Sequence, residues 1–404
     1  MSTSLLCHGF GLRGYQYLRS KYIKGTVVFK IEQNPLDLRC PACNSAQVIR
    51  RGVLERDFKT LPIGNKPVTI VLGIQRVECE SCWKLRQVKV DFAHPRRSYT
   101  KAFERYALDL LRHMTIKDVA EHLRVGWDLI KDIQKCNLQR IFSRPKLKSL
   151  RWIAIDEIYI GTRQRYLTVV LDLKGGRVVF VDNGKSADAL VPFWKRLKRS
   201  KAQIEAVAID MSRAYINAVS TNLKNAAIVF DHFHIIKLFN EKLTDLRRDL
   251  HREATDGLGK NILKGTRWLL LKNPENLDIR HNERQRLEEA LQINKPLATA
   301  YYMKEELRFL WTQADKTAAE NYLRDWIARA QVSGIKMLIK FAKTLLTHST
   351  GILAYYDYPI STGPLEGTNN KIKTMNRQAY GFRDMEFFKL KIMAIHQSKY
   401  ALVG

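Results

Sequence analysis

The amino-acid sequence predicts an α+β protein made of several domains. Its 404 residues suit two to four domains, and a content of 45% hydrophobic residues is enough to build their cores. Two Cys-x-x-Cys pairs lie near the N-terminus, and a segment with helically spaced apolar residues follows them. After residue 150, short β-type runs mix with helical runs, which indicates a sheet packed against helices.

Four cysteines predict that the first domain is a zinc ribbon. Cys40 pairs with Cys43 and Cys79 with Cys82, and 35 residues separate the two pairs. Such pairs on neighbouring loops can hold one structural Zn²⁺ tetrahedrally and stabilise a unit that buries little apolar surface. The run at residues 68–77 is typical of a strand leading into the second pair. A disulfide framework is the alternative, which a cytosolic setting disfavours.

The next segment predicts a DNA-reading helix-turn-helix. Apolar and small residues between positions 116 and 135 have the spacing of two crossing helices, and Ala120 is small enough for a close crossing. Arg124 stands at the turn where glycine is usual, so a plain helical hairpin is the alternative. In the DNA-reading interpretation, residues 127–140 form the recognition helix. The side chains expected to face DNA are Lys131, Gln134 and Lys135.

The order of the following elements is that of a ribonuclease-H-like fold: three antiparallel strands, a helix, a strand, a helix and a strand. These runs are at residues 152–156, 166–172, 178–182, 187–199, 204–210, 212–223 and 226–230. The second helix is expected to be capped at Ser212. In this fold the first and fourth strands are neighbours, so we expect Asp156 and Asp210 to lie close together.

Three carboxylates are the candidates for chemistry. Asp156 and Asp210 end or interrupt β-type runs, and Glu366 opens a basic helix near the C-terminus. Hard divalent cations prefer oxygen ligands, and two Mg²⁺ ions held by carboxylates can cut or join a phosphodiester. A single acid after a strand is usually only its polar end, so the hypothesis depends on all three together.

The composition indicates a polyanionic partner. Lysine and arginine number 69 against 40 aspartates and glutamates, which gives a net charge of +29 and suits nucleic acid. A generally basic surface, as on a ribosome-associated or membrane-surface protein, is the alternative. The sequence has no apolar run of about 20 residues, and its start lacks the pattern of a secretory signal. We therefore expect a soluble, intracellular protein without a membrane partner.

Nearly the whole chain resembles the DDE transposases of bacterial insertion sequences, specifically the zinc-ribbon-bearing ISL-three family. The resemblance extends from the paired cysteines to Tyr380-Gly-Phe-Arg383. Its most specific segments are residues 155–157, 210–212, 230–237, 265–274 and 363–373.

The resemblance implies a transposase that binds terminal inverted repeats and catalyses metal-dependent phosphodiester hydrolysis and strand transfer. Asp156, Asp210 and Glu366 match the catalytic acids, which would hold two Mg²⁺ or Mn²⁺ ions. Asp231 and His234 match an Asp-x-x-His signature and would shape the site. The long helical stretch before Glu366 resembles an all-α insertion in the core.

The resemblance also implies domains, partners and a location. The expected domains are a zinc ribbon at 1–93, a helix-turn-helix at 94–148, a first core part at 149–238, an α-helical insertion at 239–358 and a C-terminal core helix at 359–404. Candidates for phosphate contacts on that last helix are Asn370, Lys371 and Lys373, with a solvated basic face as the alternative. Because two element ends must be synapsed, we expect at least a homodimer on double-stranded terminal-repeat and target DNA, in the cytoplasm at the nucleoid.

Two other functions stay open. A catalytically silent, sequence-specific DNA-binding regulator derived from a transposase would keep the ribbon and the helix-turn-helix, but the intact acids argue against it. A structure-selective nuclease of the same fold would cut junctions without preference for terminal sequences, and the N-terminal sequence-reading module argues against that.

Overall fold

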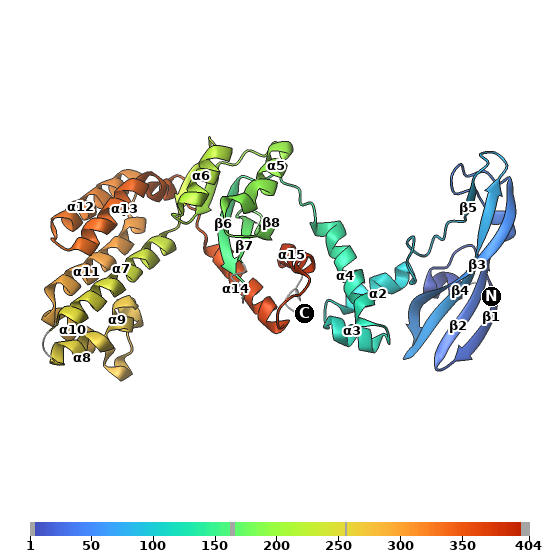
Figure 1. Cartoon of the computed structure of the whole chain (residues 1–404), viewed down its shortest axis with the longest axis horizontal. Coiled ribbons are helices and arrows are strands. Elements are labelled where there is room, and N and C mark those ends of the chain that lie inside the picture. The colour runs from blue at the N-terminus through green and yellow to red at the C-terminus, as the bar shows by residue number, and fades with distance from the viewer. Residues whose placement is uncertain (1–4, 162–165, 255–256, 397–404) are drawn as a thin grey trace. The chain divides into compact units, whose positions relative to one another are not determined.

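The computed structural model describes residues 5–161, 166–254 and 257–396 and divides into two compact units (Figure 1). The first unit runs to Ser143 and includes Gln378–Lys391, and the second contains Arg144–Arg377 with Ile392 and the residues directly after it. Within the described ranges, every helix is too short or too polar to cross a membrane.

A five-stranded sheet forms the N-terminal part of the first unit. Its order is β1-β2-β4-β3, with β5 paired to β4. The strands are β1 (Tyr15–Ile23), β2 (Thr26–Gln33), β3 (Val48–Ile63), β4 (Lys66–Cys79) and β5 (Leu85–Gln87). Buried and less buried residues alternate along most of β4, and Phe58, Ile70 and Phe92 are central to the core beneath the sheet. The strand expected at residues 68–77 is confirmed as part of β4, whereas the β1–β2 hairpin was not predicted.

Among the described residues, four α-helices also belong to the first unit. They are α2 (Lys101–Leu110), α3 (Ile116–His122), α4 (Trp127–Phe142) and α15 (Met385–Met393), whose last residues pass into the second unit. Thr115 and Asp118 form a capping box that starts α3. Arg124 adopts the left-handed conformation, with φ of 53°, at the turn between α3 and α4. This backbone conformation explains why glycine is favoured there.

A mixed five-stranded sheet with the order β10-β9-β6-β7-β8 lies in the second unit. Its strands are β6 (Trp152–Tyr159), β7 (Tyr166–Asp172), β8 (Arg177–Asn183), β9 (Ala206–Ile209) and β10 (Ala227–Phe230). As predicted, β6, β7 and β8 form an antiparallel meander, and β9 pairs with β6. Strand β9 is parallel to both β6 and β10, so their carboxyl ends share one edge.

Helices α5 (Val191–Ser200) and α6 (Arg213–Asn222) accompany this sheet. Ser212 is the N-cap residue of α6, as predicted, although its hydroxyl makes no capping hydrogen bond in the described structure. The Ser212 N–H instead donates to Asp210, which forms a tight turn before the helix.

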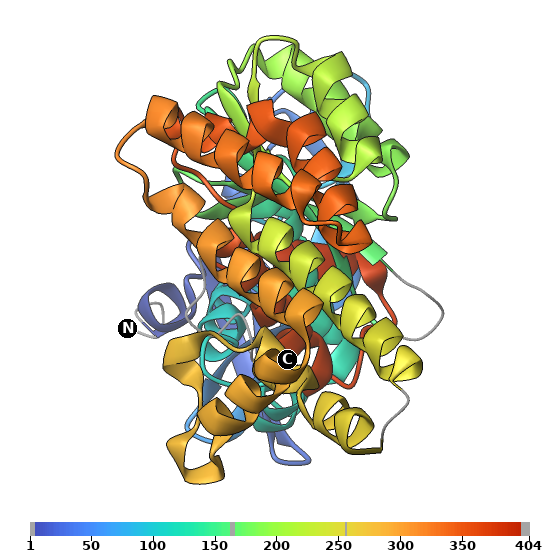
Figure 2. The same cartoon turned by 90° about the vertical axis from the view of Figure 1, so that its left-hand side faces the viewer.

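A set of helices follows β10, and several of them run side by side in Figure 2. They are α7 (His232–Glu253), α8 (Gly257–Gly265), α9 (Arg267–Leu271), α10 (Glu283–Ile293), α11 (Lys295–Leu307), α12 (Lys316–Val332), α13 (Lys336–Leu353) and α14 (Gly363–Gln378). Edge-to-face contacts among Phe239, Trp326 and Phe341 join α7, α12 and α13. Helix α7 runs without a break through residue 238, where the sequence placed a domain boundary, and Gln378–Lys391 groups with the first unit.

Candidate functional site

Two of the predicted acids lie at the shared edge of β6 and β9. Ala154 is in register with Ala208, and continuing this register by two residues brings Asp156 level with Asp210. Asp210 directly follows β9, and its Oδ1 accepts a hydrogen bond of 3.0 Å from the Ser212 N–H. The parallel pairing of two short strands therefore brings together two acids that are distant in the sequence.

The environment of Asp156 disfavours an isolated negative charge. Burial raises the pKa of Asp156, and the neighbouring Asp210 charge raises it further, whereas the Glu157 N–H, His234 and Lys237 act in the opposite direction. His234 and Lys237 therefore lie within electrostatic reach of Asp156. A bound divalent cation would stabilise both carboxylates in their ionised form.

Helix α14 carries the third acid and contacts Asp156. Glu366 is exposed in the first turn of α14. One turn later, Asn369 Nδ2 donates a 2.8 Å hydrogen bond to Asp156 Oδ2, and Asn376 Nδ2 donates one of 3.1 Å to the Ile160 carbonyl. The helix is thus anchored along β6, with Glu366 on the turn that precedes the contact to Asp156.

The donor set fits hard divalent cations, because all three acids offer carboxylate oxygens. The acids are less tightly gathered than the zinc ligands. Across the described residues, only the four cysteines place three or more possible ligand atoms within 4.8 Å of one another.

Asp231 connects two elements of the site. It is 3% exposed and caps α7 by accepting from the Phe233 N–H. Its second oxygen accepts from both the N–H and the hydroxyl of Thr362, whose carbonyl accepts from the Glu366 N–H at 2.8 Å. Asp231 therefore links the start of α7 to the start of α14. Sequence reasoning missed Thr362, which carries no signal of this role.

Glu157 makes a different set of contacts from Asp156. It accepts a hydrogen bond of 3.4 Å from the Tyr215 hydroxyl, which also lies 3.3 Å from Thr168 Oγ1. Burial and the charges of Asp210 and Asp156 raise the pKa of Glu157. These contacts place the Glu157 carboxylate beside Tyr215 of α6.

The predicted DNA-facing residues divide into two groups. On α14, the side chains of Asn370, Lys371 and Lys373 are exposed. On α4, Lys131 and Lys135 lie 3.1 and 2.7 Å from Asp384 Oδ2, and the Gln134 Oε1 is buried without a hydrogen-bond partner in the described part of the chain. In this conformation the basic face of α4 is therefore covered by the segment before α15.

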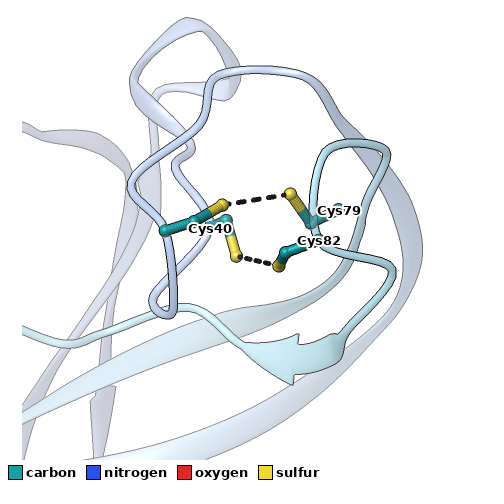
Figure 3. Close-up of side chains that lie close together, drawn as sticks. Cys40, Cys79 and Cys82 are labelled. Carbon is teal, nitrogen blue, oxygen red and sulfur yellow. Dashed lines mark hydrogen bonds between the residues drawn. The ribbon is translucent and has the colours of Figure 1, made fainter.

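The four predicted zinc ligands come together in the first unit. The Sγ atoms of Cys40 and Cys82 are 3.6 Å apart and those of Cys43 and Cys79 are 3.4 Å apart, across two facing loops (Figure 3). Four sulfurs around one Zn²⁺ with Zn–S bonds of about 2.3 Å would be about 3.8 Å apart, so the cluster fits this ion.

The loop backbone also favours thiolates. Burial alone would raise the pKa of the Cys79 thiol, but the N–H groups of Cys82 and Ser81 outweigh this effect and lower it to about 6. Burial, together with hydrogen bonds to the other sulfurs, raises the pKa of Cys82 to about 12. A cation at the centre would relieve the repulsion among four ionised sulfurs.

Comparisons with known proteins agree with this organisation. A family profile described as transposase matches residues 153–392. A second profile, described as the helix-turn-helix domain of transposase family ISL3, matches residues 88–135. A third profile, described as the zinc-finger of transposase IS204/IS1001/IS1096/IS1165, matches residues 38–82. The zinc ribbon and the helix-turn-helix are thereby confirmed, and the cysteine cluster together with the ribbon match indicates a structural zinc site.

Curated relatives extend over most of the chain. The transposase for insertion sequence element IS1001 of Bordetella parapertussis is 34% identical and covers 84% of each chain. The transposase for insertion sequence element IS1557 of Mycobacterium tuberculosis is 28% identical over 85% of this chain and 82% of its own. Among solved structures, the Drosophila P element transposase strand transfer complex matches 76% of this chain and 94% of its own chain. The sequence identity is 11% and the TM-score is 0.39, so we draw no structural conclusion from this match. The chain belongs to the ISL3 family of transposases.

Proposed function

We propose that this transposase is a DDE-type enzyme that binds the terminal inverted repeats of its insertion sequence and performs Mg²⁺- or Mn²⁺-dependent strand cleavage and transfer with a ribonuclease-H-like core. One observation carries the proposal. Asp156 on β6 lies level with Asp210, which directly follows the neighbouring strand β9, and the helix that carries Glu366 in its first turn is hydrogen-bonded to Asp156. Such a set of oxygen donors is suited to phosphoryl transfer.

In this proposal Asp156, Asp210 and Glu366 hold two divalent cations. When bound, the cations supply activation of a water or a 3′-hydroxyl for in-line attack and stabilisation of the departing 3′-oxygen. The chain itself supplies geometry: β6 and β9 fix two acids side by side, and Asp231 fixes the start of α14 through Thr362. His234 contributes positive charge near Asp156 whenever it is protonated.

DNA contacts are proposed at two places. The exposed Asn370, Lys371 and Lys373 follow Glu366 on α14 and can bind phosphates beside the acids. Lys131, Gln134 and Lys135 are proposed to face DNA in the helix-turn-helix. Because Lys131 and Lys135 pair with Asp384, that contact requires Asp384 to release them. The proposed assembly is a homodimer or larger on two element ends, acting at the nucleoid.

The testing experiment is strand cleavage of labelled DNA that carries the sequences flanking this reading frame. We expect specific cleavage in Mg²⁺ or Mn²⁺, loss of that cleavage in Asp210→Asn, and unchanged end binding by this variant. Asp182→Asn, which changes an acid on β8, is the matched control and should cut normally. Tight end binding without cutting by the unaltered protein would instead indicate a regulator, and cutting of junctions without terminal-sequence preference would indicate a nuclease.

A further inference from the structure

Asn369 is a buried polar side chain with an unusual set of contacts. It is only 5% exposed and lies on the inner face of α14 with the apolar Leu365 and Ile372. Its Nδ2 donates to Asp156 Oδ2 at 2.8 Å, and its Oδ1 is buried without a hydrogen-bond partner among the described residues. A buried amide oxygen left unpaired costs about 1–3 kcal/mol, so a purely structural role does not explain this residue.

The second asparagine on the same face provides a comparison. Asn376, two turns later, donates to the backbone carbonyl of Ile160, directly after β6, and so also joins α14 to this strand. Among the described residues, Asn376 makes no hydrogen bond to an acid and is not one of the buried side chains left without a partner. The anchoring of the helix therefore does not require the arrangement seen at Asn369.

The orientation of the Asn369 amide follows from chemistry. An ionised carboxylate only accepts hydrogen bonds, so the amide must present its NH₂ to Asp156. The amide oxygen is then fixed as an acceptor in the same site, where a hydrogen-bond donor or a cation can satisfy it. Beside a pair of acids suited to hydrated cations, a water molecule or a hydroxyl group can be that donor.

We propose that Asn369 is a positioning residue of the active site. It holds one oxygen of Asp156, leaves the other free for a cation, and uses its own amide oxygen to accept a hydrogen bond from a water or hydroxyl at the reacting centre. Because Asn369 lies one turn after Glu366, it also fixes the distance between the Glu366 helix and Asp156. This inference rests on the proposed DDE-type function and adds a fourth residue to its machinery.

The test compares Asn369→Leu with Asn376→Leu in the full-length protein. Each variant removes one hydrogen bond made by α14, and thermal unfolding is measured to show that both variants fold. Only Asn369→Leu should raise the Mn²⁺ concentration needed for half-maximal cleavage, by about 10- to 100-fold, which is typical for loss of a residue that orients a metal ligand. Binding of end DNA without divalent cations should be unchanged in both variants.

A readout without catalysis separates this inference from the proposed function. Ca²⁺ should raise the melting temperature of the unaltered protein and of Asn376→Leu, and should do so only at higher concentrations for Asn369→Leu. Equal Mn²⁺ and Ca²⁺ dependence in all three proteins would overturn the role of Asn369, even if Asp156→Asn abolishes cleavage. Full cleavage by Asp156→Asn would overturn the proposed function itself. If Asn369→Leu does not fold, Asn369→Ser, which fits the same space, provides the same comparison.

Discussion

Asp384 holds the start of α15 against the recognition helix, and its removal should have a measurable local effect. Its Oδ2 lies 2.7 Å from Lys135 Nζ and 3.1 Å from Lys131 Nζ, while its Oδ1 accepts from the Phe387 N–H. Burial opposes ionisation of Asp384, but the hydrogen bonds from Lys135, Phe387 and Lys131 outweigh it and lower its pKa from 3.8 to about 2.

The magnitude follows from these contacts. A carboxyl pKa lowered this far corresponds to at most about 2 kcal/mol of stabilisation, and screening at a side chain that is 25% exposed reduces this to about 1 kcal/mol. Because the pKa is lowered, the ionised group contributes fully above about pH 4, and the contribution is lost as the pH falls towards 2. Loss of the capping acceptor costs about 1 kcal/mol more.

Two substitutions separate the two contributions. Asp384→Asn keeps a capping oxygen and removes the charge, so it should cost about 1 kcal/mol, whereas Asp384→Ala should cost about 2 kcal/mol. Amide hydrogen exchange at Met385–Met393, measured at neutral pH, should accelerate about 5-fold in the first variant and about 30-fold in the second. Equal exchange rates in the two variants, or no acceleration in either, would refute this account of Asp384.

Three further predictions concern the zinc centre, the start of α14 and the packing of β10. Cys79→Ser should remove the bound zinc, measured by elemental analysis, and unfold β3–β5, measured by circular dichroism; an unchanged spectrum in a metal-free protein would contradict the zinc site. Asp231→Ala should release Thr362 and lower cleavage at least about 10-fold with end binding retained, and Thr362→Val should reproduce a smaller part of this loss; full cleavage by both variants would show that the link is dispensable. A Cβ at Gly351 would overlap the Phe230 ring, so Gly351→Ala should destabilise the protein by about 1–3 kcal/mol in denaturant unfolding, a cost that an unchanged midpoint would disprove.

Local sequence patterns were enough to predict the strands of the sheet in the second unit. The three strands of the meander and the strands before Asp210 and Asp231 are short apolar runs with clear turn residues between them, such as the glycines between β7 and β8. The β1–β2 hairpin was missed because β1 is mostly exposed, so its residues lack the alternation that identifies a half-buried strand. Periodicity therefore predicts elements that bury one face and fails for those that do not.

The candidate site was predictable only in part for a related reason. The acids were recognisable because each lies in or directly beside a short run with a clear local pattern, whereas Asn369 is 213 residues from its partner Asp156. A signal did exist on α14: Asn369 occupies an inward position of the helical pattern, between Leu365 and Ile372, where a polar residue needs a partner. The neighbouring Asn370 was named because it lies close to Glu366 on the same helix. It is exposed whereas Asn369 is buried, so the position of each residue around the helix axis distinguishes the two asparagines.

Helix α4 shows the opposite difficulty, because its sequence predicts an open basic surface that the structure does not have. Lys131 and Lys135 are one turn apart on α4 and together predict an open basic face for DNA. Their partner Asp384 is 249 residues from Lys135 in the sequence. No local pattern could therefore reveal that Asp384 neutralises the charge of these lysines. If these lysines do bind phosphates, Asp384→Asn should increase affinity for end DNA and steepen the dependence of log K on log salt by up to about 0.9 for each released lysine. An unchanged salt dependence would mean that the lysines hold α15 in the DNA complex as well, and that sequence reading by α4 depends on other side chains.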